Sequence, residues 1–405
     1  MLRHLPPTAT PTPFWTLARG LHPRQDADDQ FRRAFAAYAQ ADAAYTASSG
    51  RTALFLLLEA LKATAPARTD VALPAYTCPS LARVILDAGL TPRLVDISPR
   101  SMELDLARLA QAVGPQTLAV ILVHPFGIPH PVHDAQEVAH RVGAFLIEDA
   151  AQSMGAQLGD RPVGAHGDFG LFSMGPGKPL SAGGGGIVTI NQTVHNTAVA
   201  AELAAAFAQL PAPSPMANLA ATGRLAAFTL AFQPQGWWLT MRAGAQKAGD
   251  DEANWGFRLT PLATAQASVA LDQLPQLARY NADRRRRALT LMDAVSEQTE
   301  ATIPRPVGRD QGAFYLRLPL LFASTEACTA AHDLLQRHGI GAGRMYKKTL
   351  ADLLPQLKQD DYPGATQVAA TLLTLPTHHH LRPREIDIIR TVFARLATTH
   401  PATSQ

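Results

Sequence analysis

The stretch that decides the fold is residues 144–149, Ala-Phe-Leu-Ile-Glu-Asp. It is an apolar run that ends in carboxylates, as a buried strand does when it reaches the edge of a sheet. Lys178 follows Asp149 by 29 positions (178 − 149 = 29), in a turn rich in glycine and proline. A carboxylate at that edge can keep a heterocyclic ring nitrogen protonated, and a lysine on a later loop can form a Schiff base with an aldehyde on the same ring. The pair therefore indicates pyridoxal phosphate (PLP).

The phosphate of this cofactor needs a site of its own, and residues 49–52, Ser-Gly-Arg-Thr, suit it. They precede leucines at positions 54, 57, 58 and 61, which is the spacing of a buried helix. Backbone N–H groups and the helix dipole favour an anion at such a start. Ser173, shortly before the lysine, adds a hydroxyl. Each feature alone has a simpler explanation, as a cap, a turn residue or a solvated lysine, but their order and spacing together favour the cofactor.

Four segments carry a resemblance to a known family. They are Ser49-Gly50-Arg51-Thr52-Ala53-Leu54, Leu73-Pro74-Ala75-Tyr76-Thr77, Glu148-Asp149-Ala150-Ala151-Gln152-Ser153 with Gly155, and Gly164, Gly167-Asp168 and Phe172-Ser173 with Lys178. In these segments the chain resembles the DegT/DnrJ/StrS-type sugar aminotransferases, which are PLP-dependent enzymes of the aspartate aminotransferase fold (fold type I). The resemblance runs from about Ser49 to the C-terminus, with few gaps outside one central stretch.

The resemblance implies a role for each matching residue. Lys178 carries the cofactor as a Schiff base, and Asp149 pairs with the ring nitrogen. Gln152 lies near the ring hydroxyl, while Ser173 and residues 49–52 hold the phosphate. A lysine rather than a histidine at position 178 favours transamination over the deoxygenating branch of the family.

The chain departs from the family pattern at the cofactor ring and at the subunit boundary. Cys78 stands where the family usually has an aromatic residue that stacks on the ring, and Tyr76, two positions earlier, is the candidate substitute. Gly256-Phe257-Arg258 replaces an Asn-Tyr-Arg segment that the family contributes across a dimer to the phosphate. We therefore expect a homodimer in which Arg258, or backbone near Gly256, approaches the partner's phosphate site. Glycines at 183–186 replace a motif that commonly carries an acidic residue.

The alternation of helical stretches with short apolar strands predicts an α/β fold with a mostly parallel sheet between helices. The resemblance implies a seven-stranded sheet in a large domain and a smaller α+β domain at the C-terminus. The expected divisions are an N-terminal arm over 1–45, a PLP-binding domain over 46–275 with a variable insert at 190–250, and a small domain over 276–405. The expected strands are 71–73, 93–97, 118–123, 145–147, 169–172, 187–190 and 314–318, with helices at about 325–338 and from 383 onward.

Length and composition fit a two-domain enzyme, since 405 residues with 47% hydrophobic residues can bury large cores. A net charge of +3 gives no case for a nucleic-acid partner. Cys78 and Cys328 are the only cysteines, which excludes a disulfide framework and suits the cytoplasm. The N-terminus lacks the apolar core of a secretory signal.

Several conspicuous residues receive less specific interpretations. His378-His379-His380 are expected in a solvated or substrate-facing loop rather than at a metal, because adjacent residues point apart. The arginines at 284–287 are expected on a solvated helix rather than in a diphosphate clamp, and Arg344 and Tyr346 are candidates for substrate contact. Residues 219–239 are too interrupted, by Arg224 and Pro234, to span a membrane. Their burial in a dimer or against the large domain is favoured over contact with a membrane surface.

The expected function is transfer of an amino group from an amino acid, such as glutamate, to a nucleotide-linked keto sugar in the biosynthesis of cell-surface polysaccharides or secondary metabolites. Two alternatives stay open. One is a different PLP reaction, such as elimination or decarboxylation, and the other is a non-catalytic regulatory relative. Retention of Lys178, Asp149 and Ser173 argues against the second alternative.

Overall fold

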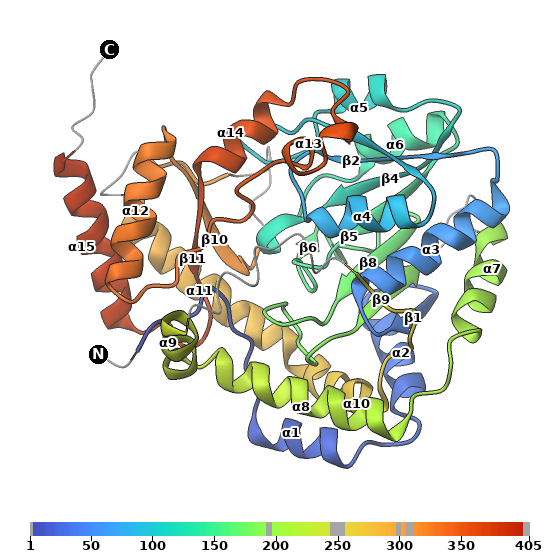
Figure 1. Cartoon of the computed structure of the whole chain (residues 1–405), viewed down its shortest axis with the longest axis horizontal. Helices are drawn as coiled ribbons and strands as arrows, with labels where there is room; N and C mark the ends of the chain where they lie inside the picture. The colour runs from blue at the N-terminus through green and yellow to red at the C-terminus, as the bar shows by residue number, and fades with distance from the viewer. Residues whose placement is uncertain (1–2, 192–196, 244–255, 297–300, 305–311, 400–405) are drawn as a thin grey trace.

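The computed structural model describes residues 3–191, 197–243, 256–296, 301–304 and 312–399. In these residues, a seven-stranded sheet lies between helices on the right of Figure 1, and a two-stranded sheet with its own helices lies on the left. A further two-stranded ribbon is formed by β6 (Gln157–Leu158) and β7 (Arg161–Pro162). The expected mostly parallel seven-stranded sheet is therefore confirmed.

The large sheet has the order β1-β9-β8-β5-β4-β2-β3. Strands β3, β2, β4, β5 and β8 pair in parallel, and β9 is antiparallel to both β8 and β1. The parallel strands end at one edge, where the crevice rule for such sheets places ligands. The strands are β1 (Ala43–Ala47), β2 (Asp70–Pro74), β3 (Thr91–Val95), β4 (Thr117–Val123), β5 (Phe145–Asp149), β8 (Phe169–Ser173) and β9 (Gly186–Ile190).

Both faces of this sheet are covered, which is why β2, β5 and β9 read as nearly continuous apolar runs and are buried throughout. One core contains side chains of α3 (Gly50–Thr64), α4 (Pro79–Asp87) and α7 (Thr197–Ala208). The other contains side chains of the helices α2 (Ala27–Tyr38), α5 (Leu106–Ala112), α6 (His133–Arg141) and α10 (Thr264–Gln273).

The smaller unit is built on the antiparallel pair β10 (Arg317–Leu321) and β11 (Leu372–Pro376). The sequence predicted a strand at 314–318, three residues too early. Phe314 and Leu316 instead donate backbone hydrogen bonds to the carbonyls of Gly127 and Phe126 in η1 (Pro125–Gly127). The other elements are α11 (Leu277–Ser296), α12 (Thr325–Arg337), α13 (Leu350–Leu353), α14 (Pro363–Thr371), α15 (Pro383–Thr399), η4 (Leu274–Gln276) and η5 (Pro355–Leu357). The expected helices at 325–338 and from 383 are confirmed.

The N-terminal residues are more than an extended arm. After an extended segment over residues 3–13, the chain forms α1 (Phe14–Leu21) and α2, and then β1, which the sequence analysis did not foresee. The extended segment lies along the smaller unit, where the Leu5 N–H donates to the Gly339 carbonyl at 2.8 Å. The first described residues of the chain thus contact the smaller unit at a residue more than 300 positions later.

Within the insert over 190–250, α7 is followed by α8 (Pro215–Ala231) and α9 (Pro234–Arg242), and α8 packs on α1 and α10 (Figure 1). Its buried side carries Ala221, Thr222 and Leu225, while Met216 and Leu230 are exposed. Among the described residues, none of the helices is long and apolar enough to cross a membrane.

The expectations of a solvated helix at 284–287 and of a solvated or substrate-facing loop at 378–380 are each wrong for one residue. Arg284 is 2% exposed and donates hydrogen bonds to the carbonyl of Ala9 at 3.3 Å and to Asn281 Oδ1 at 3.0 Å. His378 is 1% exposed, and its Nε2 lies 2.8 Å from the Pro6 carbonyl. Both errors have one cause, because the N-terminal segment covers these residues and nothing near them in the sequence indicates that contact.

Candidate active site

A cavity of about 450 Å³ lies at the carboxyl edge of the large sheet. Its wall combines the ends of β4, β5 and β8, the start of α3, and the loop that carries Lys178. Three predicted residues, Thr52, Tyr76 and Arg258, do not line it. The predicted residues that the structure brings together on this wall are Ser49, Gly50, Arg51, Cys78, Asp149, Gln152, Ser173 and Lys178.

The start of α3 forms a concave, polar part of the wall. Ser49 is the N-cap, and its Oγ accepts a hydrogen bond from the Thr52 N–H at 3.1 Å. A Cβ on Gly50 would lie 3.5 Å from the Ser173 Cβ, so the helix start and the end of β8 are neighbours. A Cβ on Gly186 would lie 2.3 Å from the backbone of Ser49, so only glycine lets β9 pass this close. The first turn of α3 thereby presents its positive dipole end to the cavity.

Asp149 ends β5 and is 6% exposed. Its Oδ1 accepts a hydrogen bond from the Ala151 N–H at 2.9 Å. Burial raises the pKa of the Asp149 carboxyl, and this hydrogen bond and the nearby Lys178 ammonium offset only part of the rise. A positive charge placed beside the carboxylate would stabilise the ionised form, which is what a protonated ring nitrogen provides.

Burial lowers the pKa of the Lys178 ammonium, and the neighbouring Cys78 and Asp149 raise it. The net fall in the pKa makes the neutral amine, the form that reacts with an aldehyde, easier to reach. The loop around the lysine is held from the N-terminal segment. Thr8 Oγ1 donates to the Gly177 carbonyl at 3.0 Å, and Thr10 Oγ1 donates to the Lys178 carbonyl at 2.5 Å.

Glu148 is buried beside Asp149 on β5, and successive strand residues point to opposite faces. Its Oε1 accepts from the His166 and Gly167 N–H groups, both at 2.6 Å. Its Oε2 accepts from the Gly164 N–H at 2.9 Å and lies 3.0 Å from His124 Nε2. Burial opposes ionisation of Glu148, but the hydrogen bonds from His124, Gly167 and Gly164 outweigh it, and the pKa is lowered.

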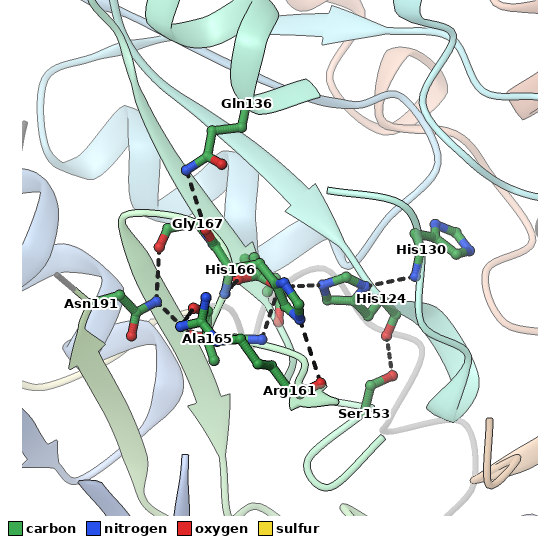
Figure 2. Close-up of polar contacts among 12 residues, drawn as sticks. His124, His130, Gln136, Ser153, Arg161, Ala165, His166, Gly167 and Asn191 are labelled. Atoms are coloured by element: carbon green, nitrogen blue, oxygen red, sulfur yellow. Dashed lines mark hydrogen bonds and ion pairs between the residues drawn. The ribbon is translucent and has the colours of Figure 1, made fainter. Parts of the chain in front are cut away.

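The tautomer of His124 follows from its neighbours, some of which appear in Figure 2. The His130 N–H donates to His124 Nδ1 at 2.9 Å, so Nδ1 carries no proton and Nε2–H donates to Glu148. His124 lines the cavity, and its backbone N–H donates to the backbone carbonyl of Asp149 at 3.0 Å. The sequence analysis missed His124, although it ends the apolar run of β4 just as Asp149 ends that of β5.

The remaining candidates lie around the cavity. The Tyr76 hydroxyl donates to the Met345 carbonyl, and its ring meets that of Tyr346 edge-on at 5.9 Å, in a separate hollow of about 20 Å³. Cys78 lines the wall of the main cavity, and its Sγ lies 3.1 Å from Ser80 Oγ. Burial raises the pKa of Tyr346 well above its ordinary value.

Arg258 and Arg344, two arginines predicted to contact cofactor or substrate, both lie outside the cavity wall. Arg258 is exposed, and its carbonyl accepts from Thr52 Oγ1 at 2.9 Å. Arg344 is held within the smaller unit, where it donates to Thr329 Oγ1 at 3.1 Å and to the Ala370 carbonyl at 2.7 Å. Neither side chain lines the cavity.

The model of the DegT/DnrJ/EryC1/StrS aminotransferase family matches residues 17–393. The chain belongs to this family. Among its relatives is the L-glutamine:2-deoxy-scyllo-inosose aminotransferase of Streptoalloteichus tenebrarius, 32% identical over 308 residues, which are 75% of this chain and 66% of the relative. The UDP-N-acetyl-3-dehydro-alpha-D-glucosamine 3-aminotransferase of Acidithiobacillus ferrooxidans is 28% identical over 350 residues, which are 86% of this chain and 82% of the relative. The chain thus spans about two thirds of the length of the first relative.

Solved structures agree on the fold of this family member. The Helicobacter pylori aminotransferase PseC superposes with a TM-score of 0.78 at 16% identity, over 98% of this chain and 100% of that one. The putative sugar aminotransferase Spr1654 from Streptococcus pneumoniae gives 0.76 at 19% identity, over 98% of each chain. The expectation of fold type I is therefore confirmed.

Proposed function

We propose that this family member is a PLP-dependent sugar aminotransferase, and one observation carries the proposal. A half-buried lysine, a buried carboxylate and a helix N-terminus with two serine hydroxyls line a single cavity. These groups match the aldehyde, ring nitrogen and phosphate of PLP in chemical character. Family membership and the names of the relatives support the same reading.

When bound, PLP supplies the electron sink that makes the Cα–H bond of an amino-acid donor acidic. The protein supplies the rest. Asp149, kept ionised by the ring's positive charge, would hold a proton on the ring nitrogen. Lys178 Nζ would take the proton from the donor's Cα and deliver it to the cofactor carbon that carries the amino group, and burial, by lowering the pKa of Lys178, makes its neutral form accessible. Ser49, Ser173 and the first turn of α3 hold the phosphate, so that ring and lysine keep their mutual position.

The proposed donor is glutamate and the proposed acceptor a nucleotide-linked keto sugar, in polysaccharide or secondary-metabolite biosynthesis. Support comes from relatives whose names specify a UDP-sugar and a GDP-sugar product, while others name a cyclitol ketone and glutamine. We place the protein in the cytoplasm, since its two cysteines, Cys78 and Cys328, are free. We also propose a homodimer, because Gly256-Phe257-Arg258 stands where the family pattern has a segment that reaches across a dimer. Arg258 is the proposed cross-subunit contact.

The direct test is reduction of the purified protein with borohydride, followed by peptide mapping. The cofactor should be fixed to Lys178, and Lys178→Ala should abolish both the label and turnover. Lys358→Ala, at a solvent-exposed lysine, serves as the matched control. A label on any other lysine would refute the assignment.

A second measurement separates transamination from other PLP reactions. One equivalent of glutamate in a single turnover, with no acceptor, should release one equivalent of 2-oxoglutarate. Release of carbon dioxide, or of ammonia at the first step, would favour decarboxylation or elimination instead. A screen of keto-sugar nucleotides then identifies the acceptor.

A further inference from the structure

One cation on the cavity wall comes from outside the segments that resemble the family. Arg224 lies on α8, within the insert over 190–250, yet it lines the same cavity as Lys178. Its neighbours on the wall include the start of α3 and the glycine turn at 183–185. Within the described part of the chain, three cationic side chains line this wall, namely Arg51, Lys178 and Arg224.

The position of Arg224 is fixed by the residues on either side of it. Leu225 is 3% exposed, and a Cβ on Gly183 would lie 3.0 Å from its Cα, so α8 packs directly on the glycine turn. Gly183 has a φ of +71°, a conformation that glycine adopts without strain. Thr222 Oγ1 donates to the Gly20 carbonyl at 2.9 Å, which ties α8 to α1. The helix that carries Arg224 is therefore packed in place, and the Arg224 side chain is exposed where it lines the cavity.

The guanidinium of Arg224 has no hydrogen-bond or ion-pair partner among the residues that the structure describes. The surrounding sequence offers none either, because residues 203–249 contain no aspartate or glutamate. An unpaired arginine on the wall of a polar cavity favours an anionic ligand, and its planar fork suits phosphate oxygens.

The phosphate end of the cavity otherwise has mostly neutral donors, and the chain has Gly256 where the family pattern has an asparagine that reaches the phosphate. The glycine turn beside Arg224 is joined to the start of α3, since Ser49 forms a bridge with Gly185. We propose that Arg224 binds a phosphate oxyanion at this end of the cavity, and its place beside α3 assigns the cofactor's own phosphate. This inference rests on the proposed function. It places the cationic side chain that binds the phosphate in the same subunit as Lys178, outside the four segments that carry the resemblance.

The test compares Arg224→Gln with Arg242→Gln, a control at an exposed arginine on α9 in the same insert that stacks on Trp238. Each apoprotein is titrated with PLP and with pyridoxal, which lacks the phosphate. Loss of one charge-assisted hydrogen bond, about 1.5–3 kcal/mol, corresponds to about a 10- to 150-fold rise in the dissociation constant for PLP. Pyridoxal should bind both variants and the parent equally, and inorganic phosphate should compete with PLP less well in Arg224→Gln. Arg224→Lys should recover part of the affinity.

Three results would overturn the inference. The affinity for PLP in Arg224→Gln could stay within twofold of the parent, or the affinities for PLP and pyridoxal could fall together. A rise in KM confined to a nucleotide-linked acceptor, with unchanged cofactor affinity, would assign Arg224 to the acceptor's phosphate and refute the cofactor assignment. Borohydride labelling of the parent separates this inference from the proposed function. If Lys178 is labelled while Arg224→Gln binds PLP normally, only the role of Arg224 fails.

Discussion

Replacing Glu148 with glutamine should destabilise the protein strongly while adding no bulk. The Glu148 carboxylate accepts hydrogen bonds from three backbone N–H groups and from His124 Nε2. A glutamine side chain keeps one oxygen and turns an NH₂ group toward the donors at the other position. Either orientation leaves two buried donors unpaired, at about 1–3 kcal/mol each, so we expect a loss of about 2–6 kcal/mol.

The assay is urea unfolding of the apoprotein at pH 7, with Glu202→Gln as the control. Glu202 is exposed on α7, so its substitution should change the unfolding free energy by less than about 0.5 kcal/mol. Using apoprotein keeps cofactor binding from masking the effect. A loss below about 1 kcal/mol in Glu148→Gln would show that the four hydrogen bonds do not hold this part of the sheet edge together.

The pH dependence gives this prediction a second check. The pKa of Glu148 is lower in the folded protein than its ordinary value of 4.5. A depressed carboxyl pKa contributes stability that is fully present above the unfolded pKa and is lost as the pH falls through the folded value. The difference between parent and Glu148→Gln should therefore be constant near neutral pH and shrink below about pH 4.5. A difference that grew on acidification would refute the reasoning.

Three further predictions concern the cofactor, the buried arginine and the subunit boundary. Asp149→Asn should slow release of 2-oxoglutarate in a single turnover by about 100-fold or more while PLP still binds, and a near-parental rate would remove Asp149 from its role. Arg284→Met should lower the free energy of unfolding in urea by about 2–4 kcal/mol, against less than about 0.5 for the exposed Arg286→Met, because buried acceptors lose their donor. In sedimentation the protein should be a dimer, and a fully active monomer would contradict this expectation. Arg258→Ala should weaken PLP binding, and an unchanged affinity for PLP would remove Arg258 from the phosphate site.

Much of the fold and the centre of the site could be predicted from local sequence. The strands are continuous apolar runs, and Asp149 and Lys178 stand where a strand end and a glycine-rich loop place them. The residues that were misjudged depend on contacts between distant segments. Arg284 is buried because residues near Ala9 pass over it, and the strand expected at 314–318 starts later because its first residues bond to η1. Arg224 was interpreted only as an interruption, since nothing in the sequence shows that α8 returns to the cavity.

The N-terminal segment has a practical consequence for anyone who engineers this enzyme. Arg3 donates to Glu385 at 2.9 Å, and Thr8 and Thr10 bond to the carbonyls of Gly177 and Lys178. Residues 3–10 therefore act as a strap between the C-terminal helix and the loop that positions the reactive amine. Trimming them to shorten an expression clone, or fusing a bulky partner directly ahead of them, would loosen the lysine loop without touching any residue of the cavity wall. Libraries aimed at new acceptors should keep this strap intact and vary only those wall residues that have no role toward the cofactor.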